Sequence, residues 1–204
     1  MAAIVLLIVG TGSVVVGVHE QRHPLTGPTV SHTPTRAPKG SSVTPLTVAR
    51  SAPVSLSIPA LDLTVPLITL GINFDGSVQV PTSSQQAGWF KLGPTPGQLG
   101  SAVILGHVDS YRGPGVFFEI RSLNIGDRVD VSLADGVTAQ FSVTSVVMYS
   151  HDQFPAQQVY GSRGISALQL VTCGGVFDTQ TRGYLSNVVV FTSLVSAIPP
   201  TALS

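Results

Sequence analysis

SAVILG at residues 101–106 and ALQLVT at residues 167–172 are the segments that decide the fold of this chain. Both are apolar along most of their length, which is typical of β-strands that are buried on both faces. Each segment ends in residues that can do chemistry, because HVDS follows the first segment and CGG follows the second. Strand ends hold side chains on a rigid frame and leave them accessible, so we expect the functional site at these two ends.

The sequence around these segments predicts an all-β fold. From residue 54 onward, short runs of Val, Ile, Leu and Phe are separated by Gly, Pro, Asp and Asn, as in a barrel or a sandwich. Apolar residues do not recur with helical spacing for long, so only residues 85–89 and 116–120 are expected to form a helical turn or two. We expect strands at residues 54–58, 65–70, 102–106, 128–133, 139–149, 167–172 and 188–194.

The chain before the folded part has a different composition. Residues 2–18 carry no charge and are rich in Ile, Val and Leu, which indicates a membrane segment. The next residues are dense in Pro, Ser, Thr and Gly, as in a flexible spacer. We expect a single-pass membrane protein with its folded domain outside the cell, although the basic residues after the segment alone favour the cytoplasm. The predicted parts are a membrane segment at 1–18, a spacer at 19–52, the folded domain at 53–196 and a tail at 197–204.

Composition excludes several classes of function. Ten Lys and Arg residues balance ten Asp and Glu residues, and only 10% of the 204 residues are charged. A chain with so little positive charge has no surface for gripping a nucleic-acid backbone. The only cysteine is Cys173, which excludes an internal disulfide and a multi-cysteine metal site.

Cys173 and His107 are the candidate reactive pair. A thiol nucleophile needs a neighbour that favours the thiolate and a proton donor for the leaving group, and one imidazole can supply both. Two structural alternatives stay open, namely that Cys173 is a small buried hydrophobe and that His107 is satisfied by a backbone carbonyl. The remaining histidines are poorer candidates because they lie in the spacer or in a polar loop: His19, His23, His32 and His151.

Four short motifs contain or follow this pair along the chain, namely GHVDS at 106–110, LVTCGGVFD at 170–178, Tyr184, and NVVVF at 187–191. Together they resemble the active-site strands of actinobacterial sortases, nearest to class F. The resemblance spans roughly residues 54–195, and the ordered set is far more specific than any one short motif. It implies an eight-stranded β-barrel with short helices, an outward-facing active site and cell-wall substrates.

The resemblance also implies a reaction. Cys173 would attack the Thr–Gly bond of an LPxTG-like sorting signal to form a thioester, which an amine then resolves. His107 would protonate the departing amine and deprotonate the incoming one. The implied partners are secreted proteins with a C-terminal sorting signal and a peptidoglycan precursor or other amine acceptor. The chain would be a transpeptidase of the cysteine peptidase class, and this scheme requires neither a metal nor an organic cofactor.

The arginine of the sortase pattern is displaced in this sequence. Sortases place an arginine after the cysteine, where it binds substrate and stabilises the oxyanion. The position that directly follows Tyr184 holds Leu185 here, and the nearest arginine is Arg182. We therefore predict Arg182 as the third catalytic residue, with Arg112 and Arg163 as alternatives.

Four further residues are candidates for substrate binding. Thr172 matches the Thr-Cys pair of the family, although it would also suit the end of a strand. Asp109 and Tyr184 lie within the motifs, and for Asp109 a role in stabilising the loop is the alternative. Trp89, the only tryptophan, could line a peptide groove, although such residues are more often part of the core.

Two rival functions stay open. An L,D-transpeptidase is also a β-rich cysteine enzyme, but its cysteine typically follows Ser-x-Gly, whereas Leu-Val-Thr precedes Cys173. A wall-associated binding module that has lost catalysis is the second rival, and the displaced arginine motivates it. Reactivity of the Cys173 thiol would separate that module from an enzyme. The sequence does not distinguish wall anchoring from pilus assembly or hydrolysis, although a compact domain favours anchoring.

Overall fold

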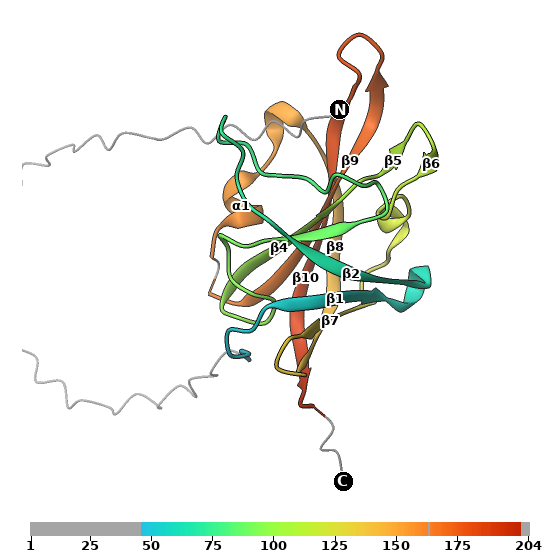
Figure 1. The fold of residues 1–204 in the computed structure, drawn as a ribbon. Coiled ribbons are helices and arrows are strands. Elements are labelled where there is room, and N and C mark those ends of the chain that lie inside the picture. The colour runs from blue at the N-terminus through green and yellow to red at the C-terminus, as the bar shows by residue number, and fades with distance from the viewer. Residues whose placement is uncertain (1–45, 163, 201–204) are drawn as a thin grey trace, which may run out of the picture. The chain divides into compact units, whose positions relative to one another are not determined.

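The computed structural model describes residues 46–162 and 164–200, and eight of their strands close into a barrel (Figure 1). The order around the barrel is β1-β2-β3-β4-β9-β10-β8-β7. This architecture confirms the predicted all-β, eight-stranded fold. The strands are β1 (Pro53–Ile58), β2 (Leu63–Leu70), β3 (Ala87–Phe90), β4 (Gly100–Gly106), β7 (Arg128–Leu133), β8 (Thr138–Ser150), β9 (Ser166–Asp178) and β10 (Gly183–Ile198).

Short elements connect these strands. A small two-stranded sheet and four short helices lie between them: β5 (Asp109–Ser110), β6 (Gly113–Pro114), η1 (Pro59–Leu61), η2 (Ile120–Ser122), η3 (His151–Gln153) and α1 (Ala156–Tyr160). The turn predicted at 116–120 is present, and η2 begins at its end. The helical turn predicted at 85–89 is wrong, because Ala87–Phe90 forms β3 between β2 and β4. Neighbouring strands on both sides satisfy the backbone of this segment, and that pairing outweighs its local preference.

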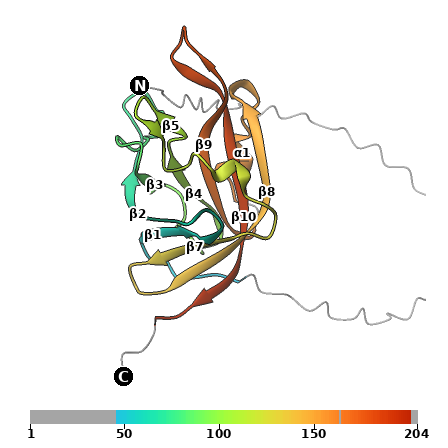
Figure 2. The ribbon, with the colours of Figure 1, turned by 90° about the vertical axis from the view of Figure 1, so that its right-hand side faces the viewer.

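All the strands predicted from the sequence are present, and the last two, β9 and β10, are longer than expected. β9 and β10 continue past the barrel wall as a hairpin, which projects from the barrel in Figures 1 and 2. Two consecutive glycines, Gly174 and Gly175, interrupt the apolar pattern of β9 and conceal this extension in the sequence. Pairing with β10 supports the backbone there, as far as Asp178 opposite Gly183.

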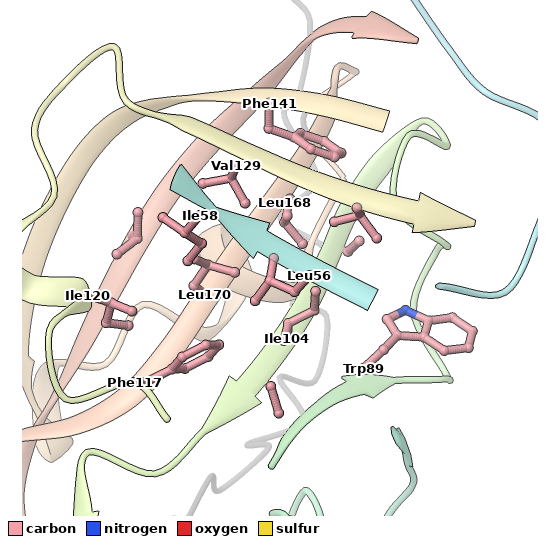
Figure 3. Packing of buried hydrophobic residues seen from close by; sticks show 14 of the residues in the cluster. Leu56, Ile58, Trp89, Ile104, Phe117, Ile120, Val129, Phe141, Leu168 and Leu170 are labelled. Carbon is pink, nitrogen blue, oxygen red and sulfur yellow. The ribbon is translucent and has the colours of Figure 1, made fainter. Parts of the chain in front are cut away.

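Hydrophobic residues pack on both faces of the barrel wall. The interior cluster includes Leu56, Ile104, Phe141, Leu168 and Leu170, as Figure 3 shows. A second cluster lies on the outer face of the wall formed by β4, β9 and β10, and it includes Val103, Leu105, Val171, Val189 and Cys173.

Consecutive residues of β4 therefore belong to different clusters, since Ile104 faces the interior and Leu105 the outer cluster. This confirms that SAVILG is buried on both sides. The outer cluster is covered by Val78 and Val80 of the β2–β3 connection and by Val159 of α1. The outer face of β9, where Cys173 lies, is thus packed beneath a loop.

The predicted membrane segment and nearly all of the predicted spacer lie outside the described residues. Within residues 46–162 and 164–200, no helix has the length and apolar character to cross a bilayer.

Close packing at the end of β4 predicts a cost for enlarging Gly106. A Cβ atom there would lie 2.7 Å from both the Phe117 ring and a Val116 methyl group. Phe117 is fully buried, so the Gly106→Ala variant should lose about 1–3 kcal/mol of unfolding free energy, as in other overpacked cores. Denaturant unfolding measures this loss. The control is Gly183→Ala, where a Cβ meets nothing within 4 Å; equal stability of the two variants would contradict the packing described here.

Candidate active site

Strand register brings His107 and Cys173 to the same level. β4 and β9 pair in parallel, with Leu105 opposite Val171 as the last pair. His107 lies two residues after Leu105, and Cys173 lies two residues after Val171. Continuing the register by two residues therefore places His107, which directly follows β4, level with Cys173. Adjacent strands lie about 4.8 Å apart, so the extended register makes His107 and Cys173 neighbours in the barrel wall. The predicted candidate pair is therefore assembled by the pairing of β4 with β9.

The Cys173 side chain is largely buried, with 8% of its surface exposed. Burial, and after it the negative charge of Asp109, raises the pKa of the Cys173 thiol to about 11. At neutral pH the thiol is therefore protonated in the resting protein. Attack by sulfur then requires a base that removes this proton as the new bond forms.

His107 is held by the connection between β2 and β3. Its Nε2 lies 2.6 Å from the carbonyl oxygen of Pro81. A carbonyl oxygen only accepts hydrogen bonds, so Nε2 carries a proton and donates it to Pro81, and Nδ1 is left to exchange a proton with a reactant. Pro81 follows Val80, which packs on the same outer cluster as Cys173. The loop thus holds the imidazole on the face of the wall that carries the thiol.

Glycines near the pair have packing roles. Gly106 makes room for Phe117, and a Cβ at Gly115 would collide with the carbonyl oxygen of His107. That carbonyl also accepts a hydrogen bond of 2.9 Å from the backbone N–H of Phe117. Gly175 has a φ of 78°, a conformation that favours glycine. The contacts at Gly106 and Gly115 fix the backbone around His107, and the φ of Gly175 sets the backbone that follows Cys173.

Asp109 and Tyr184 connect two parts of the site. The Tyr184 hydroxyl donates a hydrogen bond to the Asp109 carboxylate, and this bond raises the pKa of Tyr184 to about 12. The Tyr184 ring also packs edge-on against Phe177, with 5.3 Å between ring centroids. The bond ties the segment after His107 to the β9–β10 hairpin. Asp109 therefore contacts the hairpin and adds negative charge near Cys173, and its role in substrate binding stays a prediction.

The other two substrate-binding candidates face the barrel interior. Thr172 lies between Val171 and Cys173 of the outer cluster, so its side chain points to the opposite face of β9. Trp89 belongs to the interior cluster (Figure 3), and its indole N–H donates to the Pro94 carbonyl over 3.1 Å. The wall separates both side chains from the thiol. Trp89 thus fits the core alternative considered for it.

Arg182, the predicted catalytic arginine, lies away from the pair along the hairpin. Arg182 is exposed in the turn between β9 and β10, beyond the pair formed by Asp178 and Gly183. Asp178 lies five residues after Cys173 along β9, a distance of roughly 16 Å at the rise of a β-strand. Arg112 is also exposed and lies over the ring of its neighbour Tyr111, 5.1 Å from the centroid. Arg163 is outside the described residues, and the catalytic role of Arg182 stays a prediction.

Asn187 is a site residue that was not predicted from the sequence. It pairs directly with Cys173 across β9 and β10, and only 3% of its surface is exposed. Cys173 and Asn187 thus lie opposite each other in β9 and β10, and the register of β4 places His107 at the same level just past its end. Asn187 is the first residue of the NVVVF motif, so the sequence marked this position, but its pairing with Cys173 follows only from the strand register.

In the part of the chain that the structure describes, no group of three or more His, Cys, Asp or Glu residues could hold a metal ion.

Cys173 lies within β9 and His107 directly follows β4, and a thiol beside an imidazole is the pair of groups that cysteine-dependent hydrolases and transferases use. Comparison with known families identifies which one, since the Sortase domain family matches residues 56–195. The chain belongs to the sortase family, whose members are cysteine transpeptidases. The comparison with curated proteins found no match.

Solved sortase structures share the fold. Sortase C1 of Streptococcus agalactiae is 19% identical, with a TM-score of 0.55 over 70% of this chain and 67% of the other. Sortase A of Corynebacterium diphtheriae is 17% identical, with a TM-score of 0.57 over 74% and 64% of the two chains. SrtA of Actinomyces oris is 20% identical, with a TM-score of 0.54 over 78% and 89%. The match thus spans about two thirds of the first two proteins, and at these identities it concerns the fold.

The effect of Asp109 on the thiol predicts a change in pH dependence. The thiolate is the reactive species, so alkylation of Cys173 should accelerate with rising pH up to about 11. Removing the carboxylate in Asp109→Asn lowers the thiol pKa and moves this curve to lower pH. A thiol pKa lower by one should raise the rate at pH 8 about threefold, because the thiolate fraction grows faster than its nucleophilicity falls. Iodoacetamide labelling followed by mass spectrometry measures the rate.

The matched control for this measurement is Asp135→Asn. Asp135 lies in the turn between β7 and β8, where its Oδ1 accepts a 3.1 Å hydrogen bond from the backbone of Val137. Asparagine keeps that acceptor, so the control removes a charge without disturbing the turn. An Asp109→Asn protein that is alkylated no faster than this control would refute the influence of Asp109 on the thiol.

Proposed function

We propose that this chain is a sortase that cleaves the Thr–Gly bond of an LPxTG-like sorting signal and transfers the new Thr carboxyl group to a cell-wall amine. The observation that carries the proposal is the register of β4 and β9, which places His107, directly after β4, level with Cys173 in β9. Membership of the sortase family supports the chemistry of a cysteine transpeptidase.

The first half of the reaction forms a thioester. The Cys173 thiol gives its proton to Nδ1 of His107 while Sγ adds to the Thr carbonyl carbon, and the carbonyl electron pair moves onto oxygen. When the carbonyl re-forms, the C–N bond to glycine breaks. His107 returns its proton to the departing nitrogen, which leaves as an amine. Bonds and protons balance, with a thioester on Cys173 as the product.

The second half releases the protein. An incoming amine adds to the thioester carbonyl, and His107 removes the proton that the nitrogen loses. The C–S bond then breaks, and the proton passes from His107 to sulfur. The new amide joins the secreted protein to the acceptor, and Cys173 returns to its resting thiol. A peptidoglycan precursor is the acceptor we propose.

Position in the cell and subclass form part of the same proposal. The uncharged stretch at residues 2–18 supports an N-terminal membrane anchor, and the Pro- and Ser-rich stretch after it supports a spacer. Such a chain would be a single-pass membrane protein that works outside the cell. The motifs GHVDS and LVTCGGVFD support an actinobacterial sortase of class F.

A binding module without catalysis is the second candidate function. The high pKa of the Cys173 thiol and the distance from Arg182 to that thiol along the hairpin favour it. This module would hold a sorting peptide and leave its amide bonds intact. Turnover of a peptide substrate separates the two functions.

Variants of the reactive pair test the proposed function. With a fluorogenic LPxTG-type peptide, Cys173→Ala should show no turnover, and His107→Ala should lose about 10²–10⁴-fold in rate, as for a general acid–base. His151→Ala is the control, because His151 is an exposed histidine in η3. Cleavage that survives in Cys173→Ala would contradict the thioester route. Binding of the peptide by the wild type without any cleavage would favour the binding module.

A further inference from the structure

The carboxamide of Asn187 is buried beside the nucleophile without a hydrogen-bonding partner for its oxygen. Asn187 is 3% exposed, and its Oδ1 has no partner among the described residues. Directly paired residues of antiparallel strands point to the same face, with Cβ atoms about 5 Å apart. The Asn187 side chain therefore lies next to that of Cys173 on the outer face of the wall.

Unpaired buried polar groups are rare in native proteins, and each has a structural or functional reason. Three other side chains in the described part of the chain have such an atom: Tyr160, Gln169 and Thr172. Thr172 points into the barrel, and Gln169 lies four residues before Cys173 along β9. Asn187 is the one of the four that pairs with the nucleophile across the strands.

The free carboxamide can present its NH2 group to a ligand. The oxygen and nitrogen of an Asn side chain exchange places by rotation about its last bond. None of the side-chain hydrogen bonds found in the described residues fixes Asn187 in one orientation. Either orientation is therefore open to it, and a substrate carbonyl carbon bonded to Cys173 Sγ would bring its oxygen within reach of this donor.

We propose that the Asn187 carboxamide donates a hydrogen bond to the oxyanion that forms when Cys173 Sγ adds to the substrate carbonyl. This inference rests on the proposed function. The carbonyl electron pair moves onto oxygen as the C–S bond forms, and the Asn187 NH2 group stabilises the resulting negative charge. Asn187 would thus supply the donor that the sortase pattern assigns to an arginine.

The position of the arginines supports this assignment. Arg182 lies at the tip of the hairpin, five strand residues from the level of Cys173, and Leu185 stands where the pattern expects an arginine. A neutral carboxamide also suits a site that buries an uncharged thiol, because it donates a hydrogen bond without bringing a charge out of water.

The test compares single-turnover acylation of wild type and Asn187→Leu by an LPxTG-type peptide, with the acyl-enzyme measured by mass spectrometry. Leucine is close to asparagine in size but cannot donate a hydrogen bond. We expect the acylation rate to fall about 10²–10³-fold, as when one oxyanion donor is removed. Affinity for the peptide should change little, because the bond forms only in the transition state.

Gln169→Leu is the matched control. It makes the same exchange of a buried carboxamide on the same face of β9, away from the nucleophile, and should keep its acylation rate within a few-fold. Thermal unfolding of each variant shows whether the fold is intact. Should Asn187→Leu fail to fold, Asn187→Asp retains the shape of the side chain, and its carboxylate should slow acylation at least as much.

The outcomes separate this inference from the proposed function. Acylation of Asn187→Leu at the wild-type rate would overturn the role of Asn187 and leave the sortase reaction in place. Slow acylation of Arg182→Ala together with a normal rate in Asn187→Leu would move the role to Arg182. A wild-type protein that forms no acyl-enzyme with any LPxTG-type peptide would overturn both.

Discussion

Parallel pairing between β4 and β9 is the constraint on which the rest of the structure depends. It joins segments that lie far apart in the sequence, from Gly100 opposite Ser166 to Leu105 opposite Val171. Both strands are apolar on their two faces, so each contributes to the barrel interior and to the outer cluster. Burial of these side chains drives the pairing. The same pairing brings His107 level with Cys173, so the fold and the site have one physical origin.

The surroundings of Cys173 keep its thiol protonated at neutral pH. Burial and the Asp109 carboxylate both favour the protonated form, which is less open to oxidation and alkylation. The bond between Tyr184 and Asp109 holds that charge beside the hairpin, and the bond between His107 and Pro81 holds the base on the same face. Under the proposed function, reactivity then depends on a substrate that engages the imidazole and the thiol together.

Much of the fold could be predicted from the sequence, and so could the two chain segments that bring His107 and Cys173 together. Continuous apolar runs predicted β4 and β9, and His107 directly follows β4 as expected, whereas Cys173 lies within β9 because pairing with β10 continues that strand to Asp178. β3 was missed because four residues carry little local signal and its neighbours supply the pairing. The faces of Thr172 and Trp89 depend on how the barrel closes. The hydrogen bond from His107 to Pro81 depends on the position of a loop carbonyl, and the pairing of Asn187 with Cys173 depends on the strand register. Neither has a signature in the sequence.

A cross-link between positions 107 and 173 would test the shared level of the reactive pair without relying on any substrate. Cys173 is the only cysteine, so a disulfide within a His107→Cys chain can only join these two positions. Strands in register bring Cα atoms to about 5 Å, within the range of a disulfide. We predict that mild oxidation forms this bond within one chain, while Tyr111→Cys, exposed in the turn between β5 and β6, keeps two free thiols. Free thiols in oxidised His107→Cys would contradict the register on which the site depends.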